Sequence, residues 1–97
     1  MLSTTVSYNP GKKIRRICSH LGHDFNLRRL DGENVITYDL GNGTVSIATG
    51  LDNIAPAIDA TITIWSKDSG LSQGSFSFKG TEDELGKKLA NPSTEEE

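Results

Sequence analysis

The residue types that most often carry chemistry gather in one short segment near the start of the chain. This segment contains a cysteine, two histidines and a carboxylate: Cys18, His20, His23 and Asp24. A zinc site needs four ligands, or three and an open position, and the sequence has no second Cys or His cluster to complete one. A catalytic nucleophile needs a base and an orienting group, and Cys18 with His23 is the only conceivable pair, outside any hydrolase signature. We therefore expect no metal, no cofactor and no enzymatic activity, with Cys18 a buried thiol beside two surface histidines.

The second group of interest is a basic run that follows Gly11. Lys12, Lys13, Arg15 and Arg16 place cations on the polar side of a predicted helix, where they could contact the phosphates of a nucleic acid. Base readout in a groove uses Asn, Gln or further Arg side chains, which this run lacks. The alternatives are a solvated face that aids solubility, or a helix that balances the acidic residues of its own fold.

The carboxylates form the third group, because the middle of the chain is free of opposing charge. No lysine or arginine occurs from residue 31 to residue 66. Carboxylates spread over a sheet face and its loops can stand in for the phosphates of DNA in a site lined with Lys and Arg. The candidate partner-binding residues are Asp31, Glu33, Asp39, Asp52, Asp59 and Asp68. Ordinary acidic surface is the alternative, since the formal net charge is only -3.

Length and composition limit the kind of protein that can carry these groups. The chain has 97 residues, which predicts one domain, and its hydrophobic fraction of 34% predicts a modest core without a deep pocket. A single cysteine excludes an internal disulfide. The N-terminus lacks the pattern of a secretory signal, and no apolar run approaches the roughly 20 residues that span a bilayer. We expect a soluble, cytoplasmic protein.

Two amphipathic helices are predicted, one near each end of the chain. The first spans about residues 10–21, with Asn9-Pro10 at its start and Gly22 at its end. The second follows a capping box formed by Thr81 and Glu84 and ends at Asn91-Pro92. Apolar residues recur at helical spacing in both: Ile14, Ile17, Cys18, Leu21, Leu85 and Leu89.

Alternating apolar and polar residues predict strands between the helices. They lie at 25–30, 35–40, 44–49, 61–66 and 75–79, and Gly41-Asn42-Gly43 supplies a hairpin turn rather than a phosphate-binding loop. The strand residues expected in the core are Ile36, Tyr38, Val45, Ile47, Ile62, Ile64, Phe76 and Phe78. The residues expected on the outer, polar face of the central hairpin are Thr37, Asp39, Thr44 and Ser46.

These elements predict an α+β fold, an antiparallel sheet of about four to five strands with an N-terminal and a C-terminal helix packed on one face. Residues 1–92 form the single domain, and residues 93–97 form an acidic tail that we expect to be disordered.

The chain as a whole resembles the small anti-CRISPR proteins of phages. The resemblance rests on the length, the lean core, the helix–sheet–helix order, the segment 2–11 and the acidic terminus Glu95-Glu96-Glu97. It is similar in particular to the type I-F inhibitors of the DNA-mimic kind. The resemblance implies a monomer that binds the host CRISPR surveillance complex in the basic DNA-binding channel of its large subunit and backbone subunit. Target DNA is then excluded without chemistry, and the phage evades antiviral defence in the cytoplasm of the host bacterial cell.

Three hypotheses follow from these observations. The first is a DNA-mimicking inhibitor that uses the acidic residues, without direct binding of nucleic acid or membrane. The second is a small nucleic-acid-binding or regulatory protein that uses the basic N-terminal helix. The third is a structural module of a phage or mobile element, assembled through apolar edges.

Overall fold

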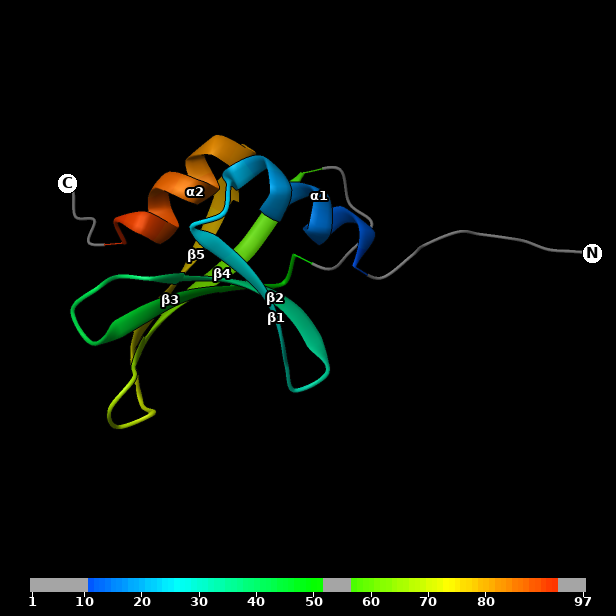
Figure 1. Ribbon diagram of the computed structural model, residues 1–97. Coiled ribbons are helices and arrows are strands. Elements are labelled where there is room, and N and C mark those ends of the chain that lie inside the picture. Colours follow the sequence, from blue (N-terminus) through cyan, green and yellow to red (C-terminus); the bar gives the residue numbers. More distant parts are fainter. Residues whose placement is uncertain (1–10, 52–56, 93–97) are drawn as a thin grey trace, which may run out of the picture.

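The computed structural model describes residues 11–51 and 57–92 of the chain. In chain order its elements are α1 (Lys12–Leu21), β1 (Phe25–Leu30), β2 (Glu33–Asp39), β3 (Thr44–Thr49), β4 (Ile58–Ser66), β5 (Ser72–Gly80) and α2 (Glu82–Ala90) (Figure 1). This order confirms the predicted α+β class. The predicted helix start at Asn9-Pro10 and the predicted tail at residues 93–97 lie outside the described residues.

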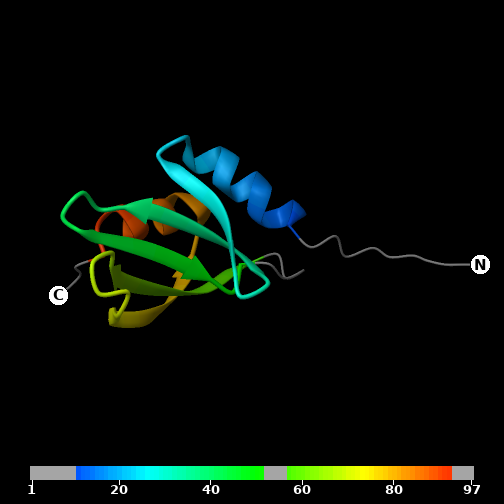
Figure 2. The ribbon, with the colours of Figure 1, turned by 60° about the horizontal axis from the view of Figure 1, so that its bottom comes forward.

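The strands form one antiparallel sheet in which sequence neighbours are also neighbours in space, in the order β1-β2-β3-β4-β5. Such a meander needs only short connections between adjacent strands. Successive side chains of each strand point to opposite faces, so residues that pair across two strands share a face. Figure 2 shows that the sheet is twisted, with the β1–β2 hairpin turned relative to β4 and β5.

Both helices pack on the same face of the sheet, as predicted, and we call this the helix-covered face (Figure 1). The opposite face carries no helix and is called the open face. Burying each large aliphatic side chain of the core contributes roughly 1.5–3 kcal/mol to the hydrophobic term of folding. The buried cluster between helices and sheet is Ile14, Ile17, Ile36, Ala48, Leu51, Ile58, Ala60, Ile62, Leu85 and Leu89.

The two helices approach each other closely at Gly86, a buried residue of α2. A Cβ atom on Gly86 would lie 2.7 Å from Cδ2 of Leu21 in α1, which is closer than carbon atoms pack. Glycine weakens a helix interior by about 1 kcal/mol relative to alanine. The predicted capping box is confirmed and supports α2, because Thr81 Oγ1 accepts from Glu84 N and Glu84 Oε1 accepts from Thr81 N.

The facing of β3 differs from the prediction. Val45 and Ile47 lie on the open face, whereas Ser46 and Ala48 lie on the helix-covered face and have no exposed surface. The expectation that Val45 and Ile47 face the helices, with Thr44 and Ser46 outside, is therefore wrong, although Ile47 is buried as predicted, on the open face. A shift of one residue in a strand exchanges its two faces completely.

The physical reason for this facing is the position of α2 over the middle of the sheet. Ser46 pairs with Tyr38 and Ala48 pairs with Ile36, so each small residue of β3 lies beside a large residue of β2 beneath the helices. The Ser46 hydroxyl donates a hydrogen bond of 2.6 Å to the carbonyl oxygen of Leu89. That carbonyl lies in the last turn of α2, where backbone acceptors lack a partner within the helix.

Removal of the Ser46 hydroxyl should destabilise the fold. Ser46→Ala leaves the buried Leu89 carbonyl without its donor, so we expect the free energy of unfolding to fall by about 1–3 kcal/mol. Chemical denaturation followed by circular dichroism measures this change. The matched control is Ser77→Ala on exposed β5, which should change stability by less than about 0.5 kcal/mol. Equal effects of the two substitutions would contradict the burial of Ser46 beneath α2.

Candidate binding surfaces

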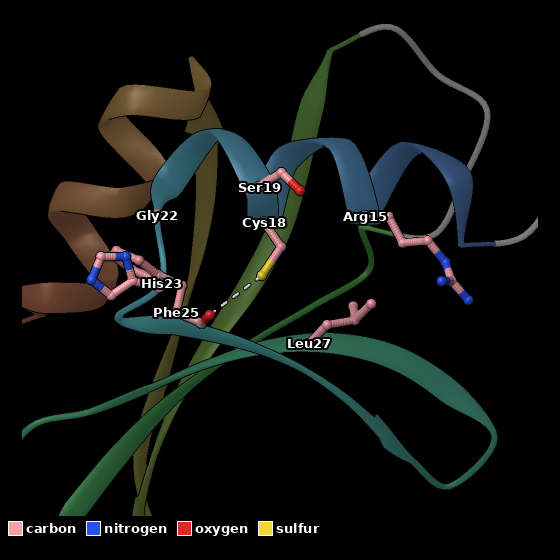
Figure 3. Close-up of a pocket in the computed structure, with 7 residues that line it drawn as sticks. All are labelled: Arg15, Cys18, Ser19, Gly22, His23, Phe25 and Leu27. Atoms are coloured by element: carbon pink, nitrogen blue, oxygen red, sulfur yellow. Dashed lines mark hydrogen bonds between the residues drawn. The ribbon is translucent and has the colours of Figure 1, made fainter.

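A groove between α1 and β1 contains the cysteine of the first candidate group (Figure 3). Its lining residues are Arg15, Cys18, Ser19, Gly22, His23, Phe25 and Leu27. The helix supplies one wall, and the start of β1 supplies the apolar side chains of Phe25 and Leu27. The Cys18 thiol donates a hydrogen bond of 3.5 Å to the carbonyl oxygen of Phe25.

The environment of Cys18 does not favour a nucleophile. Burial raises the pKa of the Cys18 thiol above its ordinary value, which reduces the reactive thiolate at neutral pH. Figure 3 shows the imidazole of His23 turned away from the sulfur, so His23 is not placed to act as its base. Within residues 11–51 and 57–92, no group of three Cys, His, Asp or Glu side chains is placed to hold a metal ion.

The cations of α1 divide between two flanks of the helix. On the flank that faces α2, Arg16 Nη1 lies 2.6 Å from Glu82 Oε2, and His20 Nε2 lies 2.8 Å from Asp83 Oδ1. Exposed pairs of this kind add little stability, but they keep these side chains engaged within the fold. The other flank carries Arg15, whose side chain has no ion pair among the described residues. The hypothesis that the helix balances acidic residues of its own fold therefore holds for one flank.

Three of the predicted acidic residues gather at one end of the sheet, which we call the β1–β2 end. Asp31 is exposed in the β1–β2 turn, Glu33 begins β2, and Asp59 is exposed near the start of β4. β2 and β4 are separated only by β3, and both Glu33 and Asp59 lie close to Gly50, whereas Asp31 lies beyond them in the β1–β2 turn. Glu33 Oε2 accepts a hydrogen bond of 2.6 Å from Gly50 N, which ties β2 to the end of β3.

Two other predicted acidic residues lie at the opposite end of the sheet, the β2–β3 end. Asp39 closes β2, and Asp68 is exposed in the β4–β5 turn. Six residues separate Glu33 from Asp39, so the two ends of the sheet are roughly 20 Å apart along a strand. Of the predicted set, the sheet thus brings Glu33 and Asp59 close together, with Asp31 in the adjoining turn, and Asp52 lies outside the described residues.

The negative charge of Asp39 is balanced by an ion pair with Lys67, a residue that was not among the predicted site residues. Lys67 Nζ lies 2.7 Å from Asp39 Oδ2, and Gly41 N donates a hydrogen bond of 2.9 Å to Asp39 Oδ1. The hydrogen bond from Lys67, followed by that from Gly41, lowers the pKa of the Asp39 carboxyl. The pairing of β3 with β4 could have indicated this contact. It places Lys67 beside the β2–β3 turn, where Lys67 N donates a hydrogen bond to Gly43 O.

The open face carries cations as well as carboxylates. A groove along this face is lined by Asn26, Arg28, Arg29, Leu30, Thr37, Asp39, Val45, Ile47 and Lys67. Its floor is apolar because the facing of β3 places Val45 and Ile47 there. The open face is therefore less polar and less uniformly acidic than the sequence predicted.

No protein-family model, no curated protein and no solved structure matches this chain. The arrangement of its own residues is consequently the basis for the functional argument. No helix in the described part of the chain is long and apolar enough to span a membrane.

The Asp39–Lys67 pair predicts a measurable titration. The folded-state pKa of Asp39 is lowered, so the pair favours the folded state above the unfolded pKa, and this contribution is lost as the pH falls through the lowered pKa. In Lys67→Met we expect the pKa of Asp39 to rise toward its ordinary value, as followed by NMR of the side-chain carboxyl. Lys79→Met on β5 is the control and should leave the Asp39 titration unchanged. An unaltered titration in Lys67→Met would show that the pair does not form in solution.

Proposed function

We propose that this protein is a non-catalytic inhibitor that uses the β1–β2 end of its sheet to bind a basic, DNA-binding site on a protein partner. The observation that carries the proposal is the contrast between the two charged groups. At the β1–β2 end, Asp31 and Asp59 have no ion pair among the described residues, and Glu33 lies beside them. On α1, by comparison, Arg16 and His20 are engaged by α2.

Unpaired carboxylates on the rim of a sheet are suited to a basic partner. Asp31 and Asp59 are exposed to solvent, and carboxylates that enter a site lined with Lys and Arg release counterions as the phosphates of DNA do. Charges of this kind act chiefly on the rate of association and on specificity. Because three carboxylates match only a short stretch of duplex backbone, the proposed contact is a local mimic rather than a full-length imitation of DNA.

The partner that we propose is the type I-F CRISPR surveillance complex, and this choice rests on the resemblance to anti-CRISPR proteins. The contact would lie in the basic channel of the large subunit and the adjacent backbone subunit, where target DNA enters. Occupation of that channel blocks target binding by exclusion, so the protein needs no nucleophile, metal or cofactor. The partly buried thiol of Cys18 is compatible with this mode of action.

The alternative is nucleic-acid binding by the basic helix, which the free flank of α1 keeps open. Lys12 and Arg15 are exposed on α1, and Arg28 and Arg29 are exposed on the neighbouring strand β1. This hypothesis requires direct binding of DNA or RNA that weakens steeply with salt. An inhibitor of the mimic kind should bind neither DNA nor RNA.

Neutralising the two unpaired carboxylates should slow binding to the surveillance complex. In Asp31→Asn combined with Asp59→Asn, we expect the association rate with the purified complex to fall about tenfold at low salt, with a smaller effect at high salt. Asparagine suits residue 31, where φ is 50°, because it tolerates the left-handed region. Association kinetics on the immobilised complex, with and without competing target DNA, provide the measurement.

The matched control is Asp68→Asn, an exposed carboxylate at the other end of the sheet, which should leave the rate unchanged. A second control is a gel shift with labelled duplex and single-stranded DNA in the absence of the complex. Binding of this DNA that is lost in Arg15→Gln would replace the proposal with the basic-helix hypothesis. Equal effects of Asp68→Asn and the double substitution would remove the β1–β2 end as the contact.

A further inference from the structure

β1 is an edge strand of the sheet, and its unpaired side can be assigned residue by residue. Phe25 N donates to Gly22 O, and Phe25 O accepts from the Cys18 thiol, so the backbone groups of Phe25 point away from β2. The N–H and C=O of one strand residue point to the same side and alternate along the strand. Leu27 and Arg29 therefore direct their backbone groups outward, while Asn26 and Arg28 pair with β2.

The register of the remaining strands supports this assignment. Leu40 N bonds to Thr44 O, and Lys67 N bonds to Gly43 O, which fixes the same alternation across β2, β3 and β4. No hydrogen bond to the outward backbone groups of Leu27 or Arg29 occurs among the described residues. The edge of β1 thus offers two donors and two acceptors to an added strand.

The groove between α1 and β1 runs along this edge (Figure 3). Phe25 and Leu27 are only partly buried there, and Cys18 closes the groove on the helix side. An added strand would place every second side chain over this apolar surface, because its residues alternate between faces as those of β1 do. The groove therefore selects apolar residues at alternate positions of the added strand.

The charged residues around the edge determine which side chains are favoured at the remaining positions of the added strand. Arg15 lines the groove, and Arg28 is exposed on the open face of β1. The exposed Arg29 shares the face of Leu27 and donates a hydrogen bond of 3.4 Å to Asn34 Oδ1. The groove lining contains no carboxylate. Asp24 and Asp31 flank β1 just beyond its two ends, and β1 itself contains Arg28 and Arg29 but no carboxylate, so the middle of the edge is basic. An acidic side chain directed to the open face would lie across from Arg28, where opposite charges on neighbouring strands stabilise pairing.

A second copy of the chain is a poor occupant of this edge. Antiparallel self-pairing of β1 with Leu27 opposite Arg29 would bring the Arg28 side chains of two copies together. Pairing with Leu27 opposite Leu27 would leave Arg28 opposite Asn26, without a carboxylate. Pairing of β1 with the other edge strand, β5, would bring Arg28 and Arg29 to Lys79. Like charges directly opposite each other destabilise pairing of strands. Charge complementarity consequently favours a foreign segment over a copy of this protein.

We propose that the β1 edge docks an extended segment of a partner protein in which acidic residues alternate with apolar residues. The segment adds a sixth strand to the sheet, with hydrogen bonds to the backbone of Leu27 and Arg29, its apolar side chains over Phe25 and Leu27, and its acidic side chains toward Arg28. This surface is distinct from the carboxylates of the β1–β2 end, so the inference does not rest on the proposed function.

The probe is a fluorescently labelled synthetic peptide of alternating glutamate and valine, matched to the 6 residues of β1. We expect saturable binding by fluorescence anisotropy, and weaker binding as salt rises. A peptide of alternating lysine and valine is the charge control and should bind at least tenfold more weakly. Hydrogen exchange followed by NMR should show new protection of the amides of Leu27 and Arg29 when the glutamate peptide is bound.

Two substitutions at one position separate the backbone contact from the charge. Arg29→Pro removes an outward N–H that takes no part in the β1–β2 ladder, and proline is tolerated at such edge positions. Arg29→Gln removes the same charge and keeps the N–H. We expect Arg29→Pro to bind about tenfold more weakly than Arg29→Gln, which corresponds to one lost hydrogen bond. Unchanged circular dichroism and thermal melting of Arg29→Pro verify its fold.

Several results would overturn the proposal. These are no saturable binding of the glutamate peptide, equal binding of the two peptides, or equal affinity of a folded Arg29→Pro and Arg29→Gln. Competition of a single-stranded oligonucleotide for the edge, without dependence on the residue 29 amide, would assign it to a nucleic acid. Concentration-dependent dimerisation that Arg29→Pro abolishes would assign it to a second copy. Neither peptide result bears on the rate measured with Asp31→Asn and Asp59→Asn, so the two proposals fail separately.

Discussion

The close packing of α2 over the middle of the sheet is the constraint on which the surfaces of this protein depend. Space beneath the helix is limited, so β3 presents Ser46 and Ala48 to it, and the Ser46 hydroxyl satisfies the carbonyl of Leu89. This choice places Val45 and Ile47 on the open face. Since the strands are paired in fixed register, the facing of β3 determines the facing of every other strand, and with it the sorting of charges between the two faces and the two edges.

The same packing accounts for the uneven charge of the molecule. α2 presents Glu82 and Asp83 to α1, where they engage Arg16 and His20. The opposite flank of α1 turns toward β1 and keeps Arg15 free of any ion pair that the described residues offer. A basic edge and an acidic end of the sheet thus exist on one small domain. A net charge of -3 conceals this division, because it averages over surfaces that meet different partners.

Local signals in the sequence were sufficient for the elements but not for their facing. The helical spacing of Ile14 and Ile17, and the capping box at Thr81, depend on neighbouring residues and predicted both helices correctly. The segment of β3 has apolar side chains on both faces, since Ala48 alternates with Ile47, and only the position of α2 decides between them. Likewise, Asp31 and Asp39 lie at opposite ends of the sheet because β2 runs between them. The composition of the acidic segment does not reveal this arrangement.

The two free edges of the meander are not equivalent as binding elements, although both carry cations. By the alternation that fixes β1, the outward backbone groups of β5 belong to Ser75, Ser77 and Lys79, and the groove between β5 and α2 is lined by Glu84 and by three lysines, Lys79, Lys87 and Lys88. An acidic strand would meet the like charge of Glu84 there as well as these lysines. Lysine on an exposed edge commonly serves to prevent aggregation, and this role suffices for β5. The groove between α1 and β1 is largely apolar and has no carboxylate in its lining, and the Arg15 side chain has no ion pair within the described residues, so prevention of aggregation alone does not account for the arrangement of this edge.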